Sequence, residues 1–167
     1  DCVVVMRSAL WVAAAVALVV LCCCGRTGVV ERRRLVGGMA TIPNRKEHLQ
    51  IAVASLEGQL DRLHVHANYP EDEPLPACLD RPWITVSRGP PDRGDVGKFV
   101  GLWKEREGPD RSACCYYFTL DDDIVYPKDY VARTLAGLLR YGGRAVVSHH
   151  GGTLPERVTS FYGERDT

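Results

Sequence analysis

The sequence predicts an α/β fold, with a mixed, mostly parallel sheet, flanking helices and an N-terminal hydrophobic helix before them. Three observations predict it. From about Leu35 onward, strand-like and helix-like segments alternate, which is typical of a sheet with crossover helices. The composition, 46% hydrophobic and 25% charged, lies in the range of globular domains. An unbroken apolar run occupies residues 9–24. We therefore divide the chain into an apolar segment with a basic linker, 1–34, and one globular domain, 35–167.

Charge and cysteine content exclude several classes of protein. The 167 residues include 21 Lys and Arg against 21 Asp and Glu, so the formal net charge is zero. Such a chain has no long-range field to attract a polyanion, and we expect no nucleic-acid partner. The seven cysteines form no Cys-x-x-Cys pair and no spacing typical of a zinc site. We therefore expect reduced thiols rather than a disulfide framework.

The apolar run 9–24 is interpreted as a membrane anchor. As a helix its 16 residues would span roughly 24 Å, slightly less than the roughly 30 Å hydrocarbon core of a bilayer. Arg26 and Arg32–Arg34 follow it, which favours a cytoplasmic location for the following domain. A cleaved signal stays open because Met6 and Arg7 precede the run, although the run does not end in a small-x-small site. A fragmentary start is the third alternative, because residues precede Met6.

The first half of the domain begins with a predicted strand over 35–42. A helix follows, with Asn44 as its N-cap and Glu47 as the partner in a capping box. Apolar residues then recur at spacings of four and three, which indicates one buried helical stripe. The stripe consists of Leu49, Val53, Leu56, Leu60 and Leu63.

The remaining elements are predicted from composition and periodicity. The predicted strands cover 63–69, 83–87, 114–120 and 145–148, and the predicted helices cover about 98–105 and 129–142. The segment 88–97 is rich in Gly, Pro and Asp, so we predict a loop there. In the strand 63–69, His64 and His66 alternate with apolar residues, and we expect them to be surface residues on its polar face.

An acidic triplet, Asp121, Asp122 and Asp123, follows the most apolar predicted strand. Adjacent carboxylates repel one another unless solvent, donors or a cation offset their charge. Mg²⁺ and Mn²⁺ prefer oxygen ligands and often use one or two carboxylates together with substrate phosphates. If the strand conformation continued, Asp121 and Asp123 would point the same way and could share one ion. The alternative is a plain acidic loop that caps the next helix.

The segment 94–98, Gly-Asp-Val-Gly-Lys, is glycine-rich and leads into a predicted helix. It is not a Walker A motif, because Phe99 stands where that motif has the Ser or Thr that binds magnesium. Backbone amides at a helix start can still bind an anion, with Lys98 adding a point charge. A plain turn with a surface lysine is the other interpretation.

Three segments, taken in order, resemble family 2 glycosyltransferases with the GT-A fold, most closely the bacterial-type enzymes. They are 39–45 (MATIPNR), 94–99 (GDVGKF) and 117–130 (YFTLDDDIVYPKDY). The resemblance extends from about Leu35 to Gly151. It implies a Rossmann-like, nucleotide-sugar-binding domain that transfers a sugar from a nucleotide-diphospho-sugar to an acceptor hydroxyl.

The resemblance also implies a set of site residues. By this similarity Asp121 and Asp123 match the pair that holds Mn²⁺ or Mg²⁺. The residues that correspond to the nucleotide-sugar site are Thr41, Pro43, Arg45, Asp95, Lys98, Asp121 and Asp122. A cation such as Lys98 or Arg45, together with the metal ion, would stabilise charge on the departing nucleoside diphosphate.

The general base that such a reaction needs is not identified in the sequence. In the family it lies in the acceptor-binding half, so we expect the domain 35–167 to be incomplete at its C-terminal end. Two alternatives to a transferase stay open: a nucleotide-sugar-binding remnant without catalysis, and a nucleotidyltransferase, which also uses carboxylates at strand ends.

Overall fold

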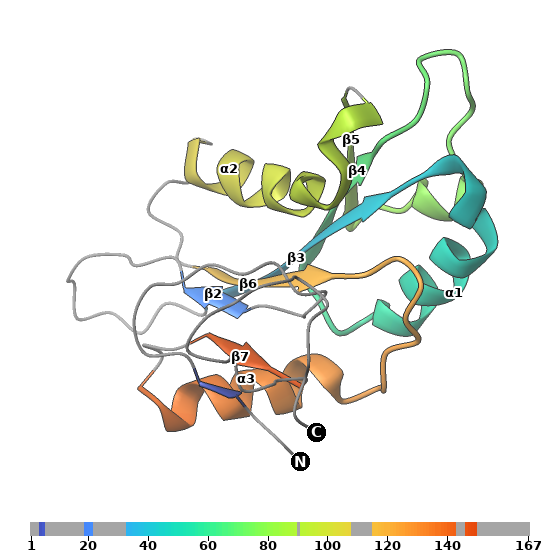
Figure 1. Cartoon of the computed structure of the whole chain (residues 1–167). Helices are drawn as coiled ribbons and strands as arrows, with labels where there is room; N and C mark the ends of the chain where they lie inside the picture. Colours follow the sequence, from blue (N-terminus) through green and yellow to red (C-terminus); the bar gives the residue numbers. More distant parts are fainter. Residues whose placement is uncertain are drawn as a thin grey trace, which may run out of the picture.

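The computed structural model describes residues 33–89, 91–107, 115–142 and 146–149, and the backbone of two short segments near the N-terminus. Within these residues the main sheet has the strand order β2-β6-β3-β4-β5 (Figure 1). Its parallel strands are β3 (Arg34–Thr41), β4 (Arg62–Ala67), β5 (Ile84–Arg88) and β6 (Cys115–Leu120). The edge strand β2 (Val19–Leu21) is antiparallel to β6. The predicted α/β class and the mostly parallel sheet are confirmed.

Helices cover both faces of this sheet (Figure 1). On one face α1 (Lys46–Leu56) and α3 (Tyr130–Arg140) share the larger hydrophobic core with Met39 of β3 and Phe118 of β6. On the other face α2 (Val100–Glu107) packs Leu102 against a smaller core. That smaller core consists of Val36, Cys115 and Tyr117. The alternation of side chains along each strand separates the two cores.

Short 3-10 turns connect several of these elements. They are η1 (Pro43–Arg45) between β3 and α1, η2 (Ala77–Leu79) before β5, and η3 (Pro91–Phe99) between β5 and α2. The last predicted strand, 145–148, is shorter than expected and lies outside the main sheet. It forms β7 (Val147–Ser148), which pairs antiparallel with β1 (Val4–Val5).

The predicted capping box at Asn44 is wrong. Asn44 lies inside η1, and the N-cap position of α1 is Arg45, whose side chain makes no capping hydrogen bond. Pro43 fixes the first turn after β3, and the Arg45 N–H donates to the Ile42 carbonyl at 3.1 Å, so the helix starts later than the pattern suggests. The helix also ends earlier, at Leu56, and the chain turns at Gly58 with φ = 77°.

The predicted loop 88–97 is also wrong in part. Arg88 belongs to β5, and η3 runs through most of the segment. Gly94, with φ = 48° and ψ = −136°, interrupts η3 and separates two short helical turns. Glycine adopts this backbone conformation at little cost, which explains how a segment rich in helix breakers still forms two turns.

His64 and His66 are buried rather than on the surface. Their exposed fractions are 7% and 3%, because η3 and α2 cover the face of β4 on which they lie. Glycines permit this close approach: a Cβ on Gly97 would be 2.5 Å from His66 Cδ2, and a Cβ on Gly101 would be 2.4 Å from His64 Cβ. The polar face of the strand was predicted; the cover over it was not.

Most of the apolar run 9–24 lies outside the described residues. Val19–Leu21, which the sequence analysis placed in an apolar helix, form the strand β2 instead. Among the described residues, no helix combines the length and the hydrophobicity that crossing a bilayer requires. The membrane anchor stays a prediction.

Candidate functional site

The candidate site lies where the four parallel strands end. Because they run in the same direction, their carboxyl ends meet at one edge of the sheet, which is where open α/β sheets bind ligands (Figure 1). β3 leads into η1 at this edge, β5 leads into η3, and β6 leads into the acidic triplet. All three segments that the sequence analysis selected therefore meet here. We call this region the edge site.

Lys98, from the end of η3, pairs with the first carboxylate of the triplet. Its Nζ donates to Asp121 Oδ1 and lies 3.4 Å from Asp95 Oδ1. The side chains of Lys98 and Asp121 are only 10% and 16% exposed, whereas that of Asp95 is 85% exposed. The inner pair is thus screened by water much less than an ordinary surface pair.

Arg45, from η1, pairs with the other two carboxylates. Its Nη1 lies 2.8 Å from Asp122 Oδ1 and 3.0 Å from Asp123 Oδ2, so oxygens of two adjacent residues converge on one nitrogen. The hydrogen bond and the charge of Asp122 raise the pKa of the Arg45 guanidinium. Asp122 is buried, Asp123 is 43% exposed and Arg45 is 45% exposed, so this pair opens to solvent on one side.

The edge site carries more negative than positive charge. Its ion pairs join four carboxylates, those of Asp95 and the triplet, to two basic side chains, Arg45 and Lys98. The four carboxylates and two basic side chains of this cluster therefore have a formal net charge of −2. A divalent cation is the smallest ligand that would balance them.

The position of Lys98 depends on a close approach between η3 and the sheet. The Tyr117 hydroxyl of β6 donates to the Lys98 carbonyl at 2.6 Å. Gly38 of β3 lies directly below: a Cβ there would be 1.9 Å from the Tyr117 hydroxyl and 2.1 Å from the Lys98 carbonyl oxygen. Only glycine at position 38 allows the backbone of η3 to pack this closely against the sheet.

Asn68, at the end of β4, ties η3 to β3. Its side-chain nitrogen donates to the Thr41 carbonyl at 3.4 Å and to the Gly94 carbonyl at 3.3 Å. Asn68 was not among the predicted site residues, and neither were Tyr117 and Tyr126, which position Lys98 and Asp121. For Asn68 a signal existed, since a polar residue at the end of a parallel strand faces the ligand edge. The two tyrosines looked like ordinary core residues.

Several buried polar atoms near this edge make no hydrogen bond within the described residues. They are Thr41 Oγ1, Asn68 Oδ1, the Tyr69 hydroxyl and Asp122 Oδ2. Burial raises the pKa of the Tyr69 phenol. The Thr41 hydroxyl nearby opposes this shift, although the two hydroxyls do not have the geometry of a normal hydrogen bond. Buried polar atoms without partners are rare in folded proteins, and ligand sites are one place where they occur.

The donor set suits a hard divalent cation. The triplet offers carboxylate oxygens, and the buried Asp122 Oδ2 atom has no hydrogen-bond partner among the described residues. Within the described residues no group of three or more His, Cys, Asp or Glu side chains is arranged around a metal position. A site built from one or two carboxylates and substrate phosphates has no such group. Asp121 and Asp123, the predicted metal ligands, pair instead with Lys98 and Arg45.

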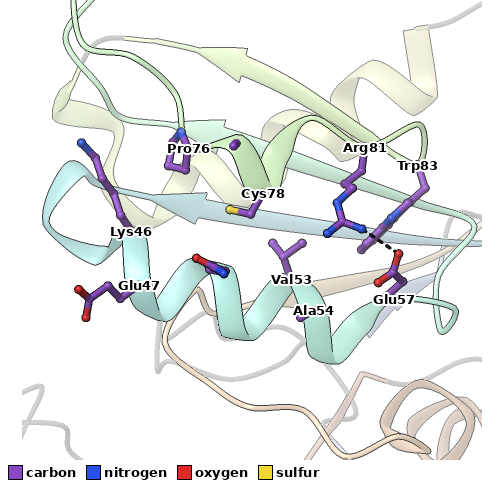
Figure 2. A pocket seen from close by; sticks show the side chains of 11 residues that line it. Lys46, Glu47, Val53, Ala54, Glu57, Pro76, Cys78, Arg81 and Trp83 are labelled. Atoms are coloured by element: carbon purple, nitrogen blue, oxygen red, sulfur yellow. Dashed lines mark hydrogen bonds and ion pairs between the residues drawn. The ribbon is translucent and has the colours of Figure 1, made fainter.

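A separate groove of about 400 Å³ lies between α1 and the segment that contains η2 (Figure 2). Val53 and Cys78 line its middle, and Trp83 lies near one end. There an ion pair joins Arg81 to Glu57 at 3.1 Å. Burial raises the pKa of the Cys78 thiol, so this cysteine is less reactive than a free one. None of the predicted site residues lines this groove.

Comparison with known proteins adds no relative: no protein-family model and no curated protein matches the chain. The function is therefore argued from the edge site itself.

Proposed function

We propose that this chain is the donor-binding part of a metal-dependent glycosyltransferase of the GT-A type. It moves a sugar from a nucleotide-diphospho-sugar to an acceptor hydroxyl. The observation that carries the proposal is the meeting of three separate segments at one sheet edge, where Arg45 and Lys98 contact the acidic triplet. A site with adjacent carboxylates and two basic side chains suits a divalent cation together with a diphosphate.

Each residue has a role in this proposal. Asp121 and Asp123 would hold Mn²⁺ or Mg²⁺, and Arg45 and Lys98 would bind the phosphate oxygens. Thr41, Pro43, Asp95 and Asp122 line the remainder of the nucleotide-sugar site. The Thr41 hydroxyl and the Asp122 Oδ2 atom, which have no partner in the described part of the chain, offer hydrogen-bonding capacity to a polar ligand.

The chemistry follows from charge. When bound, the metal ion would stabilise the negative charge that grows on the leaving nucleoside diphosphate. Lys98 would act on the same charge from a position that is 10% exposed, where a fixed ammonium group interacts more strongly than in water. The buried Tyr117 hydroxyl, through the Lys98 carbonyl, fixes the backbone of that lysine before any ligand arrives.

Calorimetry with nucleoside diphosphates tests the proposal. We expect binding in the presence of Mn²⁺, loss of that binding with EDTA, and loss in Asp123→Ala. Asp72→Ala, which removes an exposed carboxylate in the loop after β4, is the matched control and should bind normally. Equal affinity with Mn²⁺ and with EDTA would reject a metal-dependent site.

Supplying substrates separately distinguishes the reaction classes. Turnover of a nucleotide sugar supports a transferase, and turnover of a nucleoside triphosphate supports a nucleotidyltransferase instead. Binding without turnover supports a remnant that holds the donor but does not catalyse transfer.

We also propose attachment to a membrane through residues 9–24, with the domain on the cytoplasmic side. The support is the hydrophobicity of that run and the arginines after it. Val19–Leu21, which form the edge strand β2 in this structure, would have to leave the sheet for the whole run to enter a membrane. Flotation of the full chain with lipid vesicles tests the attachment. Recovery of the chain only in the vesicle-free fractions would contradict it.

A further inference from the structure

The basic side chains of the edge site already stand against the carboxylates that a cation would use. Lys98 Nζ contacts Asp121 Oδ1, and both side chains are mostly buried. A cation that takes this Asp121 oxygen has to displace the lysine first. The displaced ammonium group would then be mostly buried without its partner, which is costly.

Arg45 occupies an equivalent position at the other end of the triplet. Its Nη1 is within 3.0 Å of oxygens from both Asp122 and Asp123, as a bound cation would be. Unlike Lys98, the Arg45 side chain is 45% exposed, so it can leave the carboxylates and remain solvated.

From these contacts we propose that Arg45 and Lys98 are exchangeable placeholders, which couple the binding of the divalent cation to that of the diphosphate. This inference rests on the proposed function. Arg45 and Lys98 would release the carboxylate oxygens to the cation and would donate instead to the phosphate oxygens. Either ligand alone has to compete with an existing ion pair.

The consequence is positive cooperativity between the two ligands. The cation binds weakly without a diphosphate, because it has to break both ion pairs and leaves the mostly buried Lys98 ammonium group without a partner. By linkage, the diphosphate binds weakly without the cation by the same factor. The cluster's excess of two negative charges also repels a diphosphate until the cation is present.

Substituting Lys98 or Arg45 tests the proposal, because the loss of either side chain should strengthen the binding of the cation alone. Lys98→Gln and Arg45→Gln are titrated with MnCl₂ alone, and free aqueous Mn²⁺ is measured by electron paramagnetic resonance. We expect each variant of the full chain to bind Mn²⁺ alone about tenfold or more tightly than the unchanged protein, since about 1.4 kcal/mol of lost competition corresponds to tenfold. Both variants should bind Mn²⁺ with a nucleoside diphosphate more weakly.

Lys104→Gln is the matched control. It removes the same charge from an exposed position on α2, six residues beyond Lys98, and should leave Mn²⁺ affinity unchanged. An equal gain in Mn²⁺ affinity in Lys104→Gln would show that net charge alone causes the effect, and it would overturn the proposal. Thermal unfolding checks that each variant folds; if Lys98→Gln does not, the half-exposed Arg45→Gln decides the question.

Two failures are distinguishable. If the unchanged protein shows no Mn²⁺-dependent diphosphate binding, the proposed function fails. If that binding exists but Arg45→Gln and Lys98→Gln hold Mn²⁺ alone no better than the unchanged protein, only the placeholder inference fails.

Discussion

The hydroxyl of Tyr126 hydrogen-bonds to both backbone groups of Asp121. It accepts from the Asp121 N–H at 2.7 Å and donates to the Asp121 carbonyl at 3.1 Å. Tyr126 is 4% exposed, and burial raises the pKa of its phenol, so the hydroxyl keeps its proton at any ordinary pH. One buried side chain thus fixes the point at which β6 ends and the acidic triplet begins.

Tyr126→Phe removes both hydrogen bonds and leaves two backbone groups of Asp121 unpaired. We expect the free energy of unfolding to fall by about 1–3 kcal/mol and Mn²⁺-dependent nucleotide affinity to fall with it. Chemical denaturation and calorimetry measure the two effects. Tyr141→Phe, at an exposed position after α3, should change neither. Unchanged stability in Tyr126→Phe would show that the two contacts contribute nothing.

Gly38→Ala should prevent η3 from lying on the sheet. The added Cβ would meet the Lys98 carbonyl oxygen at 2.1 Å, and backbone cannot move aside as a side chain can. We expect a loss of more than about 3 kcal/mol in the free energy of unfolding, or a chain that does not fold. Gly37→Ala is the matched control, because the three atoms nearest to its Cβ would be Leu methyl groups, at 2.8–2.9 Å, rather than backbone. Its cost should be about 1 kcal/mol, and equal costs would contradict this account.

The positions of the edge-site segments could be predicted from the sequence. An apolar strand followed by Asp121–Asp123 places carboxylates at the carboxyl edge of a parallel sheet, and the order of the elements places η1 and η3 at the same edge. Strand direction alone is enough for this, because every parallel strand ends on the same side.

The contacts inside the site could not be predicted in the same way. The expectation that Asp121 and Asp123 point together assumed a continuing strand, but Asp122 and Asp123 lie in a turn, where the two-residue alternation no longer holds. Nor does any local pattern reveal that Lys98 reaches Asp121, since 23 residues separate them and the contact depends on Gly38. The burial of His64 and His66 was not predicted, because a cover formed by η3 and α2 leaves no periodic signal in the strand.

Glu105 of α2 is paired with three basic side chains from the first residues of β3 and β4. Its Oε1 accepts from His64 Nε2 at 2.8 Å and from Arg62 Nη1 at 3.0 Å, and its Oε2 lies 2.8 Å from Arg34 Nη2. Burial by itself would raise the pKa of Glu105, but His64, Arg34 and Arg62 hold it below the ordinary 4.5. This cluster holds α2, and with it η3, against β3 and β4.

Stability should fall in mild acid. Burial lowers the pKa of His64 and of His66 from 6.5, although Glu105 partly opposes this shift for His64. The unfolded chain therefore binds protons first as the pH falls below 6.5, and the stability that the neutral imidazoles provide is lost there. The contribution of Glu105 is lost as the pH falls below 4.5. Denaturation midpoints at pH 7.5, 5.5 and 4 should decrease in that order; a flat profile would contradict the assignment.

Glu105→Gln should destabilise the protein by about 1–3 kcal/mol at pH 7.5, because it removes the buried carboxylate that the buried His64 and the partly exposed Arg34 and Arg62 share. The decrease in stability below pH 4.5 should also become smaller. Glu107→Gln, an exposed change two residues further along α2, tests whether any loss of negative charge has this effect. Similar losses in the two variants would mean that the cluster does not hold α2.

Arg88, at the end of β5, binds three backbone carbonyls of the loop that follows β4. Its Nη1 donates to Pro70 at 2.7 Å and Glu71 at 3.2 Å, and its Nη2 donates to Glu73 at 2.8 Å. Glu73 in turn pairs with Lys46, the first residue of α1, at 2.8 Å. The guanidinium therefore holds the loop over the start of α1, next to the edge site.

Arg88→Lys should release this loop, because one ammonium group cannot satisfy three carbonyls in that geometry. We expect a loss of about 1 kcal/mol in local stability, seen as roughly fivefold faster amide hydrogen exchange across residues 70–76 with little change in the core strands. Arg81→Lys, at an exposed arginine that pairs with the Glu57 side chain, should leave exchange in that loop unchanged. If Arg88→Lys leaves it unchanged as well, the loop is held by its own backbone turns, and Arg88 contributes charge alone.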